Sequence, residues 1–206
     1  ELVMEDSNYI GSGAFGDVYY VRDVEGNENQ KYVVKKLRKH FLDKMEVMVL
    51  NFLKKKKIMV KEDSKTSLDK VFLKEVKALY ELKGQGIGPE LVYVNYDNHY
   101  YVVERMHITL HSLIVENLLK PSQAFKLLAL SDHYIESPYY HQDLHTNNVM
   151  WSSDLNDFRM IDWGISLLIN PEIQGALEQE KVDNLFKKDL MWHIMNYAQY
   201  KINTEV

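Results

Sequence analysis

A glycine-rich turn between two strand-like runs constrains the fold of this chain more than any other feature. Gly11, Gly13 and Gly16 stand at fixed spacing, preceded by Tyr9–Ile10 and followed by Val18–Val21. Glycine lets a backbone approach a ligand closely, because no Cβ stands in the way. A dinucleotide-binding G-x-G-x-x-G turn would open a helix, whereas β-branched and aromatic residues on both sides predict a hairpin. The segment therefore predicts an antiparallel sheet whose first turn lies over phosphate groups.

A strand with a lysine on its apolar face comes next. Side chains alternate along a strand, so Lys35 shares a face with Val33 while Lys36 lies on the other. Solvent is the usual place for a lysine. A lysine on an apolar face needs a carboxylate partner, because an unpaired buried charge is costly. Glu75 stands within the helical apolar pattern of 71–82 and supplies one, so we expect a Lys35–Glu75 ion pair and a solvated Lys36.

Three polar residues later in the chain suit phosphoryl transfer. Asp143 can hold an attacking hydroxyl and accept its proton, while Asn148 and Asp162 are hard oxygen ligands suited to Mg²⁺ on nucleotide phosphates. In isolation, such polar residues more often stabilise turns and cap helices. Their position after the glycine turn, the lysine and the glutamate favours the catalytic interpretation.

Together these motifs resemble those of the protein-kinase superfamily. The family signature reads H-R-D-L-x-x-x-N and then D-F-G. Here His141–Asn148 reads HQDLHTNN and Asp162–Gly164 reads DWG. The glycine turn, lysine, glutamate and these two motifs occur once each, in the family's order, between Tyr9 and Gly164.

The resemblance implies an α+β, bilobal protein-kinase-like fold. An N-lobe over 1–106 would hold a five-stranded antiparallel sheet and the glutamate helix. A mainly helical, shortened C-lobe over 107–206 would hold the catalytic loop, the DWG motif and a closing helix over 181–200. Compared with the family, 38–67 looks like an insertion, and 40–56 within it has a helical pattern.

The hydrophobic pattern predicts further elements on either side of a glycine-rich break at 84–89. Strands are expected over 91–96, 100–106, 149–151 and 158–161, and helices over 71–82, 108–119 and 122–136, the last with Pro121 in its first turn.

The resemblance also implies a site for ATP and Mg²⁺. Lys35, fixed by Glu75, would orient the α- and β-phosphates, and Asp143 would position the acceptor hydroxyl. Asn148 and Asp162 would hold the metal. Backbone groups of two residues after the fifth strand would bind adenine. The nucleotide-binding residues, besides Lys35 and Glu75, would be Gly11, Gly13, Gly16, Val18, Val33, Glu104 and Met106.

Two departures from the family pattern bear on the acceptor. Gln142 replaces the arginine that grips a phosphorylated activation loop, so control by that route is not expected. His145 replaces the lysine that would touch the transferred phosphate, and D-L-H-x-x-N resembles aminoglycoside and lipopolysaccharide-core kinases. No A-P-E follows Gly164, an outline similar to RIO-type kinases, the KEOPS-complex kinase, and short viral or bacterial effector kinases.

Three functions are therefore open. The resemblance favours a Ser/Thr protein kinase that acts on a protein substrate, and it leaves open an activating partner protein. The alternatives are a small-molecule phosphotransferase, favoured by His145, and a nucleotide-binding module without transfer activity.

The composition of the chain limits the binding partners and the cellular compartment that we expect. The net charge of −5 gives no global basic footprint, so nucleic acid is not an expected partner. No apolar run has membrane length. Cysteine is absent, which excludes disulfides, cysteine nucleophiles and zinc-thiolate sites. We expect a cytoplasmic protein, or one in the host cytoplasm if it is a viral or secreted effector.

Overall fold

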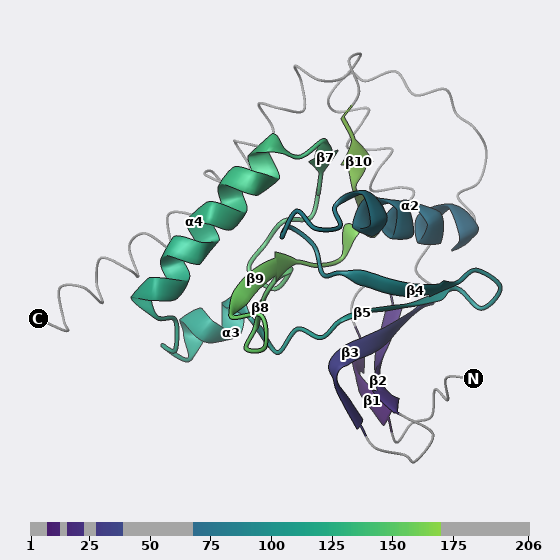
Figure 1. Ribbon diagram of the computed structural model, residues 1–206, viewed down its shortest axis with the longest axis horizontal. Coiled ribbons are helices and arrows are strands. Elements are labelled where there is room, and N and C mark those ends of the chain that lie inside the picture. The colour runs from purple at the N-terminus through teal and green to yellow at the C-terminus, as the bar shows by residue number, and fades with distance from the viewer. Residues whose placement is uncertain (1–7, 13–15, 23–27, 39–67, 170–206) are drawn as a thin grey trace, which may run out of the picture. The chain divides into compact units, whose positions relative to one another are not determined.

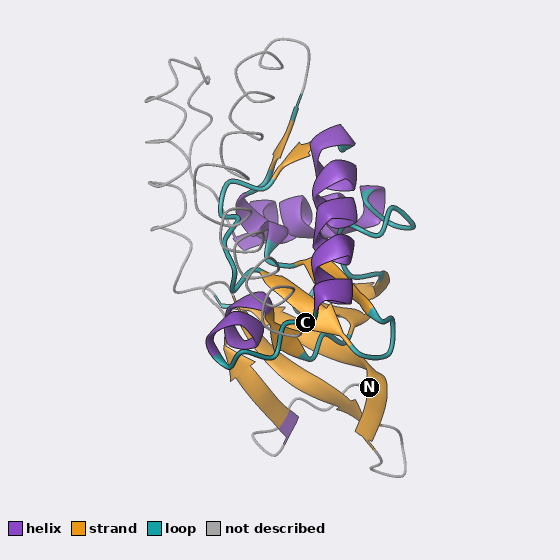
Figure 2. Cartoon of the chain, turned by 90° about the vertical axis from the view of Figure 1, so that its left-hand side faces the viewer, coloured by secondary structure: helices purple, strands orange, loops and turns teal. Residues whose placement is uncertain are grey.

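The computed structural model describes residues 8–12, 16–22, 28–38 and 68–169. Within these ranges the protein is α+β, as predicted, with a five-stranded antiparallel sheet, two smaller sheets and three α-helices (Figures 1 and 2). The predictions for Gly13, for most of the insertion and for the helices over 40–56 and 181–200 lie outside the described residues.

The chain divides into two compact units. The first unit comprises Glu1–Glu81, Glu90–Arg105 and Asp162–Ile165. The second unit comprises Leu82–Pro89, Met106–Ile161 and Ser166–Val206.

The first unit contains the five-stranded sheet, in the order β1-β2-β3-β5-β4. All neighbouring strands run antiparallel, so the predicted five-stranded antiparallel sheet is confirmed. Valine and tyrosine dominate them, residues that suit a pleated and half-buried surface. The strands are β1 (Tyr9–Ser12), β2 (Gly16–Arg22), β3 (Glu28–Leu37), β4 (Leu91–Asn95) and β5 (Tyr100–Glu104).

Both faces of the central strand β3 carry buried side chains. Lys35 lies opposite Tyr101 of β5 in the register, on one face. Val34 faces the other way and packs with Tyr100 and Val102. Because successive side chains point to opposite faces, buried Val34 and exposed Lys36 share one face of the strand, and the buried cation of Lys35 lies on the other.

Helix α2 (Leu68–Glu81) packs on the β4–β5 hairpin of the first unit (Figure 1). The Phe72 ring lies edge-on to Tyr96 and His99, with centroids 6.0 and 5.4 Å away, and tilted against Tyr101 at 6.2 Å. The helix begins three residues before the predicted start. Its buried side carries the glutamate predicted as the lysine partner, one turn beyond Phe72.

Within the described residues, the second unit contains two α-helices and two small sheets. Pro121 starts α4 (Pro121–Glu136), as predicted. No helix in the described part of the chain is both long enough and apolar enough to cross a membrane. The remaining elements are β6 (Ile108–Thr109), α3 (Leu110–Val115), β7 (Tyr139–Tyr140), β8 (Val149–Ser152), β9 (Asp157–Met160) and β10 (Leu167–Leu168), paired as β6-β8-β9 and β7-β10.

The predicted helix over 108–119 is wrong at both ends. Ile108 and Thr109 form strand β6 against β8. The Thr109 hydroxyl accepts a hydrogen bond from the Ser112 N–H at 3.0 Å, so it caps a helix that begins only at Leu110. The helix ends at Val115, and Asn117 beyond it has a left-handed φ of 57° that closes the turn.

Candidate active site

In the first unit, one buried ammonium group binds two carboxylates. Lys35 Nζ lies 2.8 Å from Oε1 of Glu75 and also donates a hydrogen bond to Oδ1 of Asp162. The partners stand 40 and 127 residues away along the chain. The predicted Lys35–Glu75 pair is confirmed, and Lys36 is exposed as expected. We call Lys35, Glu75 and Asp162 the lysine cluster.

Charge balance keeps this ammonium protonated. Burial acts to lower the pKa of Lys35, but the nearby carboxylates of Asp162 and Glu75 outweigh it and raise that pKa well above the usual range. One ammonium against two carboxylates leaves the lysine cluster with one net negative charge, which suits a further cation.

The hydrogen bonds of the described residues satisfy only one carboxylate oxygen of Glu75. The residue is 1% exposed, and Oε2 has no hydrogen-bond partner among the described residues. Burial first, and then the charge of Glu75, raise the pKa of Tyr101 well above its usual range. The sequence did not single out Tyr101, although its register opposite Lys35 puts it on the same face of the sheet.

Asp162 is held in an uncommon backbone conformation. Its φ is 64°, in the left-handed region that non-glycine residues rarely adopt. A short 3₁₀ turn, Trp163–Ile165, follows and packs against α2 with Trp163 fully buried. The large Trp163 ring is thus accommodated in the interior of the first unit. This packing fixes the carboxylate, whose Oδ2 has no partner among the described residues.

In the second unit, an amide and a carboxylate form a separate group. The side-chain nitrogen of Asn148 donates to the carbonyl of Asp143 at 2.8 Å and to its Oδ2 at 3.2 Å. Both hydrogens of the amide are thereby used, which leaves its Oδ1 as an acceptor for a cation. The Asp143 side chain is 34% exposed. We call Asp143 and Asn148 the aspartate pair.

The loop that carries the aspartate pair is fixed by buried contacts. The His141 N–H donates to the Tyr134 hydroxyl at 2.9 Å, and His141 Nε2 lies 2.7 Å from the Ile161 carbonyl. The Ile161 N–H in turn donates to the carbonyl of Asn148 at 2.9 Å. Gln142 has a left-handed φ of 65°. Strain of this kind, held by surrounding contacts, is common at functional sites.

His145 lies beside the aspartate pair. Its Nδ1 accepts a hydrogen bond from the Asn147 N–H at 3.2 Å, so the proton of the neutral ring is on Nε2. That nitrogen lies 3.7 Å from Oδ2 of Asp143, and about half of the side chain is exposed. His145 is therefore a donor that a bound anion could reach.

The glycines of the predicted turn differ in what requires them. A Cβ on Gly16 would lie 2.5 Å from the carbonyl oxygen of Lys36, so strand β3 excludes any larger residue there. A Cβ on Gly11 would meet nothing within 4 Å. Gly16 is thus required by the sheet itself, whereas a requirement for Gly11 would have to come from a ligand.

The remaining predicted nucleotide-binding residues lie at several levels of burial. Val33 is buried and Val18 is half-buried. The Glu104 N–H donates to the carbonyl of Glu90 at 3.1 Å, and its Oε2 accepts from the Glu90 N–H at 2.9 Å. The Met106 N–H has no partner among the described residues. Of the two backbone N–H groups, only that of Met106 has a hydrogen to offer a ligand.

The two predicted magnesium ligands, Asp162 and Asn148, lie in different units. No group of three His, Cys, Asp or Glu side chains that could hold a metal gathers among the described residues. Magnesium is usually bound through one or two carboxylates and substrate phosphates, not by a cage of protein ligands. Asp162 in the first unit and Asn148 in the second each offer one such oxygen.

Neither a scan against protein-family models nor a search of curated proteins finds a match for this chain. We therefore base the function on the geometry of the lysine cluster and the aspartate pair, together with the order of their motifs in the sequence.

Proposed function

We propose that this chain is an ATP- and Mg²⁺-dependent protein kinase with a bilobal kinase-like fold, which transfers the γ-phosphate to Ser or Thr hydroxyls of a protein substrate. The observation that carries the proposal is the shared bond of Lys35 to Glu75 and Asp162. A buried ion triad is weak evidence for stability, because desolvation offsets most of its attraction. Perturbed, buried charges of this kind favour a functional role.

Each residue of the lysine cluster has one task in this proposal. Glu75 holds the Lys35 ammonium in place, so that its remaining hydrogen can bind phosphate oxygens. Asp162 keeps one carboxylate oxygen for the metal. Magnesium supplies charge neutralisation on the phosphates when it is bound.

The aspartate pair serves the acceptor. Asn148 donates to Oδ2 of Asp143 and so orients the carboxylate, whose Oδ1 can accept a hydrogen bond from an incoming hydroxyl. The exposure of Asp143 permits a protein side chain to reach it. The proposal requires that the lysine cluster and the aspartate pair serve the same nucleotide.

Transfer of labelled γ-phosphate from ATP tests the proposal. Wild-type protein with Mg²⁺ should label itself or an added protein substrate on Ser or Thr, and Asp162→Asn should not. Asp132→Asn is a matched control, because Asp132 is exposed on α4 and should leave transfer unchanged. Equal labelling by wild type and Asp162→Asn would refute the assignment.

The position of His145 favours a second candidate, a small-molecule phosphotransferase. An exposed imidazole beside Asp143 could bind an anionic or hydroxylated metabolite directly. The same labelling experiment separates the two functions, because the label would then appear in a small molecule and not in protein. Magnesium-dependent ATP binding with no labelled product would instead support a binding module.

A further inference from the structure

Residues 104–107 carry the chain from the first unit, which ends here at Arg105, into the second unit, which resumes at Met106. Three of the four backbone N–H groups donate to carbonyls of the described chain, and only that of Met106 does not. The three bonds are Glu104 to Glu90 at 3.1 Å, Arg105 to Lys31 at 2.7 Å and His107 to Trp151 at 2.8 Å.

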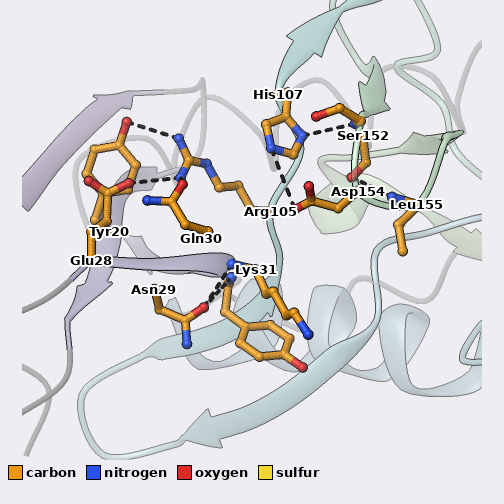
Figure 3. A network of polar contacts seen from close by, with 12 residues as sticks. Tyr20, Glu28, Asn29, Gln30, Lys31, Arg105, His107, Ser152, Asp154 and Leu155 are labelled. Atoms are coloured by element: carbon orange, nitrogen blue, oxygen red, sulfur yellow. Dashed lines mark hydrogen bonds and ion pairs between the residues drawn. The ribbon is translucent and has the colours of Figure 1, made fainter.

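The Arg105 side chain adds a second anchor within the first unit (Figure 3). Its Nη1 donates to Oε1 of Glu28 at 2.9 Å and to Oε1 of Gln30 at 3.0 Å. Its Nη2 lies 3.4 Å from the Tyr20 hydroxyl, and the guanidinium carbon sits 4.7 Å from the centre of that ring. The planar guanidinium group thus contacts both β2 and β3, an arrangement that the compact ammonium group of a lysine cannot reproduce.

On the other side of Met106, His107 is anchored within the second unit. Its Nδ1 accepts from the Ser153 N–H at 3.2 Å, and its Nε2 lies 3.8 Å from Oδ2 of Asp154 (Figure 3). Met106 is therefore the one residue of the segment with neither a backbone N–H bond nor a polar side-chain contact among the described residues.

We infer that Arg105 is a positioning residue, which fixes the backbone before Met106 so that its N–H meets a hydrogen-bond acceptor on the nucleobase. This inference rests on the proposed function and adds the residue that sets the nucleobase contact. A donor that is already oriented loses less freedom when the ligand binds. The gain in affinity should come from the nucleobase contact and not from the phosphates. Comparing a ligand that has a nucleobase with one that lacks it therefore measures this gain.

The test compares Mg·ATP with Mg·tripolyphosphate as ligands of the full chain, by calorimetry. Arg105→Met should weaken ATP binding roughly tenfold, equivalent to about 1.4 kcal/mol. It should leave tripolyphosphate binding unchanged, and in transfer assays it should raise KM for ATP at unchanged kcat. Arg159→Met is the matched control, because Arg159 forms a similar half-buried pair with Asp157 at 2.9 Å in the second unit. It should change neither affinity.

Arg105→Lys provides a milder variant in case the methionine substitution unfolds the protein. Lysine keeps the positive charge but lacks the planar guanidinium group that bonds to several partners at once. ATP binding should therefore weaken about threefold, an effect between those of wild type and Arg105→Met. Equal weakening of both ligands, or unchanged ATP binding in both variants, would show that Arg105 has no positioning role.

Two wild-type results separate this inference from the proposed function. Wild-type protein that binds ATP no more tightly than tripolyphosphate has no nucleobase contact, and the inference is then wrong while phosphoryl transfer stands. Wild-type protein that binds neither ligand overturns the proposed function, and this inference with it.

Discussion

The lysine cluster and the aspartate pair use charge in opposite ways. The side chains of Lys35, Glu75 and Asp162 are 9%, 1% and 12% exposed, and each carboxylate binds the same ammonium. Asp143 is 34% exposed, and a neutral amide orients it instead of a cation. In the first group the buried charges pair with one another, whereas in the second the Asp143 carboxylate is partly exposed to solvent and the amide of Asn148 is buried.

Substitutions in the two groups should therefore have different effects on stability and on function. Removing the Lys35 charge leaves two buried carboxylates without their cation, so both folding and function should suffer. Removing the charge of the half-buried Asp143 leaves no other charge without a partner, so only function should suffer.

The largest expected effect is on catalysis at the aspartate pair. Asp143→Asn should reduce the transfer rate by about 10²- to 10⁴-fold, because an amide cannot accept the hydroxyl proton. Its free energy of unfolding should change by less than about 0.5 kcal/mol, as for other exposed sites. Steady-state kinetics and urea unfolding check the two parts. A large loss of stability in Asp143→Asn would contradict the predicted difference between the aspartate pair and the lysine cluster.

The next effect is on stability at the lysine cluster. Lys35→Met leaves the carboxylates of Glu75 and Asp162 facing each other without a cation, which should cost about 3–5 kcal/mol of unfolding free energy. Lys36→Met on the same strand is the matched control, because Lys36 is exposed, and should cost less than about 0.5 kcal/mol. Urea unfolding at pH 7 measures both. Similar values for the two variants would mean that the buried charges do not depend on Lys35.

A smaller effect separates the two described glycines of the turn. Gly16→Ala should cost about 1–3 kcal/mol, because its Cβ meets the Lys36 carbonyl and the strands must move apart. Gly11→Ala has free space and should leave stability within about 0.5 kcal/mol. Thermal unfolding ranks the two variants. If Gly11→Ala nevertheless weakens ATP binding, the ligand and not the fold requires that glycine.

The smallest effect concerns alkaline pH. The folded protein holds the protons of Lys35 and Tyr101 above the usual pKa values of 10.5 and 10.0, so it binds protons more tightly than the unfolded chain. Their contribution to stability is therefore complete below about pH 10 and is lost as the pH rises from there towards the folded-state values.

Tyr101→Phe should remove the tyrosine part of this loss. Stability at pH 7 should fall by no more than about 1 kcal/mol, because the ring and its packing remain. Between about pH 10 and about pH 11, just above the unperturbed pKa of tyrosine, the decline should be shallower than in wild type. Tyr80→Phe is the control, because Tyr80 is 70% exposed on α2 and should follow the wild-type curve. Identical slopes for Tyr101→Phe and wild type would contradict the burial of this phenol beside Glu75.

Much of the first unit could be predicted because its signals are local. Alternation along β3 placed Lys35 and Lys36 on opposite faces, and turn residues bounded the β4–β5 hairpin. The lysine–glutamate pair followed from one physical rule, that a buried charge needs a partner. The third member, Asp162, became part of the lysine cluster only in three dimensions, because nothing local in the sequence places it beside Lys35.

The second unit was harder because its short strands depend on distant partners. Strand β6 is two residues long and exists through its pairing with Trp151 and Met150. Strands β7 and β10 pair Tyr139–Tyr140 with Leu167–Leu168, and were not predicted at all. Two residues carry no periodicity, so only tertiary contacts define such strands. Arg105 was missed for the same reason, since its three side-chain partners lie on strands far earlier in the chain.

The most direct test of the central claim is a double-mutant cycle on single-turnover transfer, combining Asp143→Asn with Asp162→Asn. If the lysine cluster and the aspartate pair serve one phosphoryl transfer, each single variant should lose nearly all of it, and the double variant should be little worse than either. Losses that simply multiply, or transfer that survives Asp162→Asn, would show that the two groups do not act on the same nucleotide.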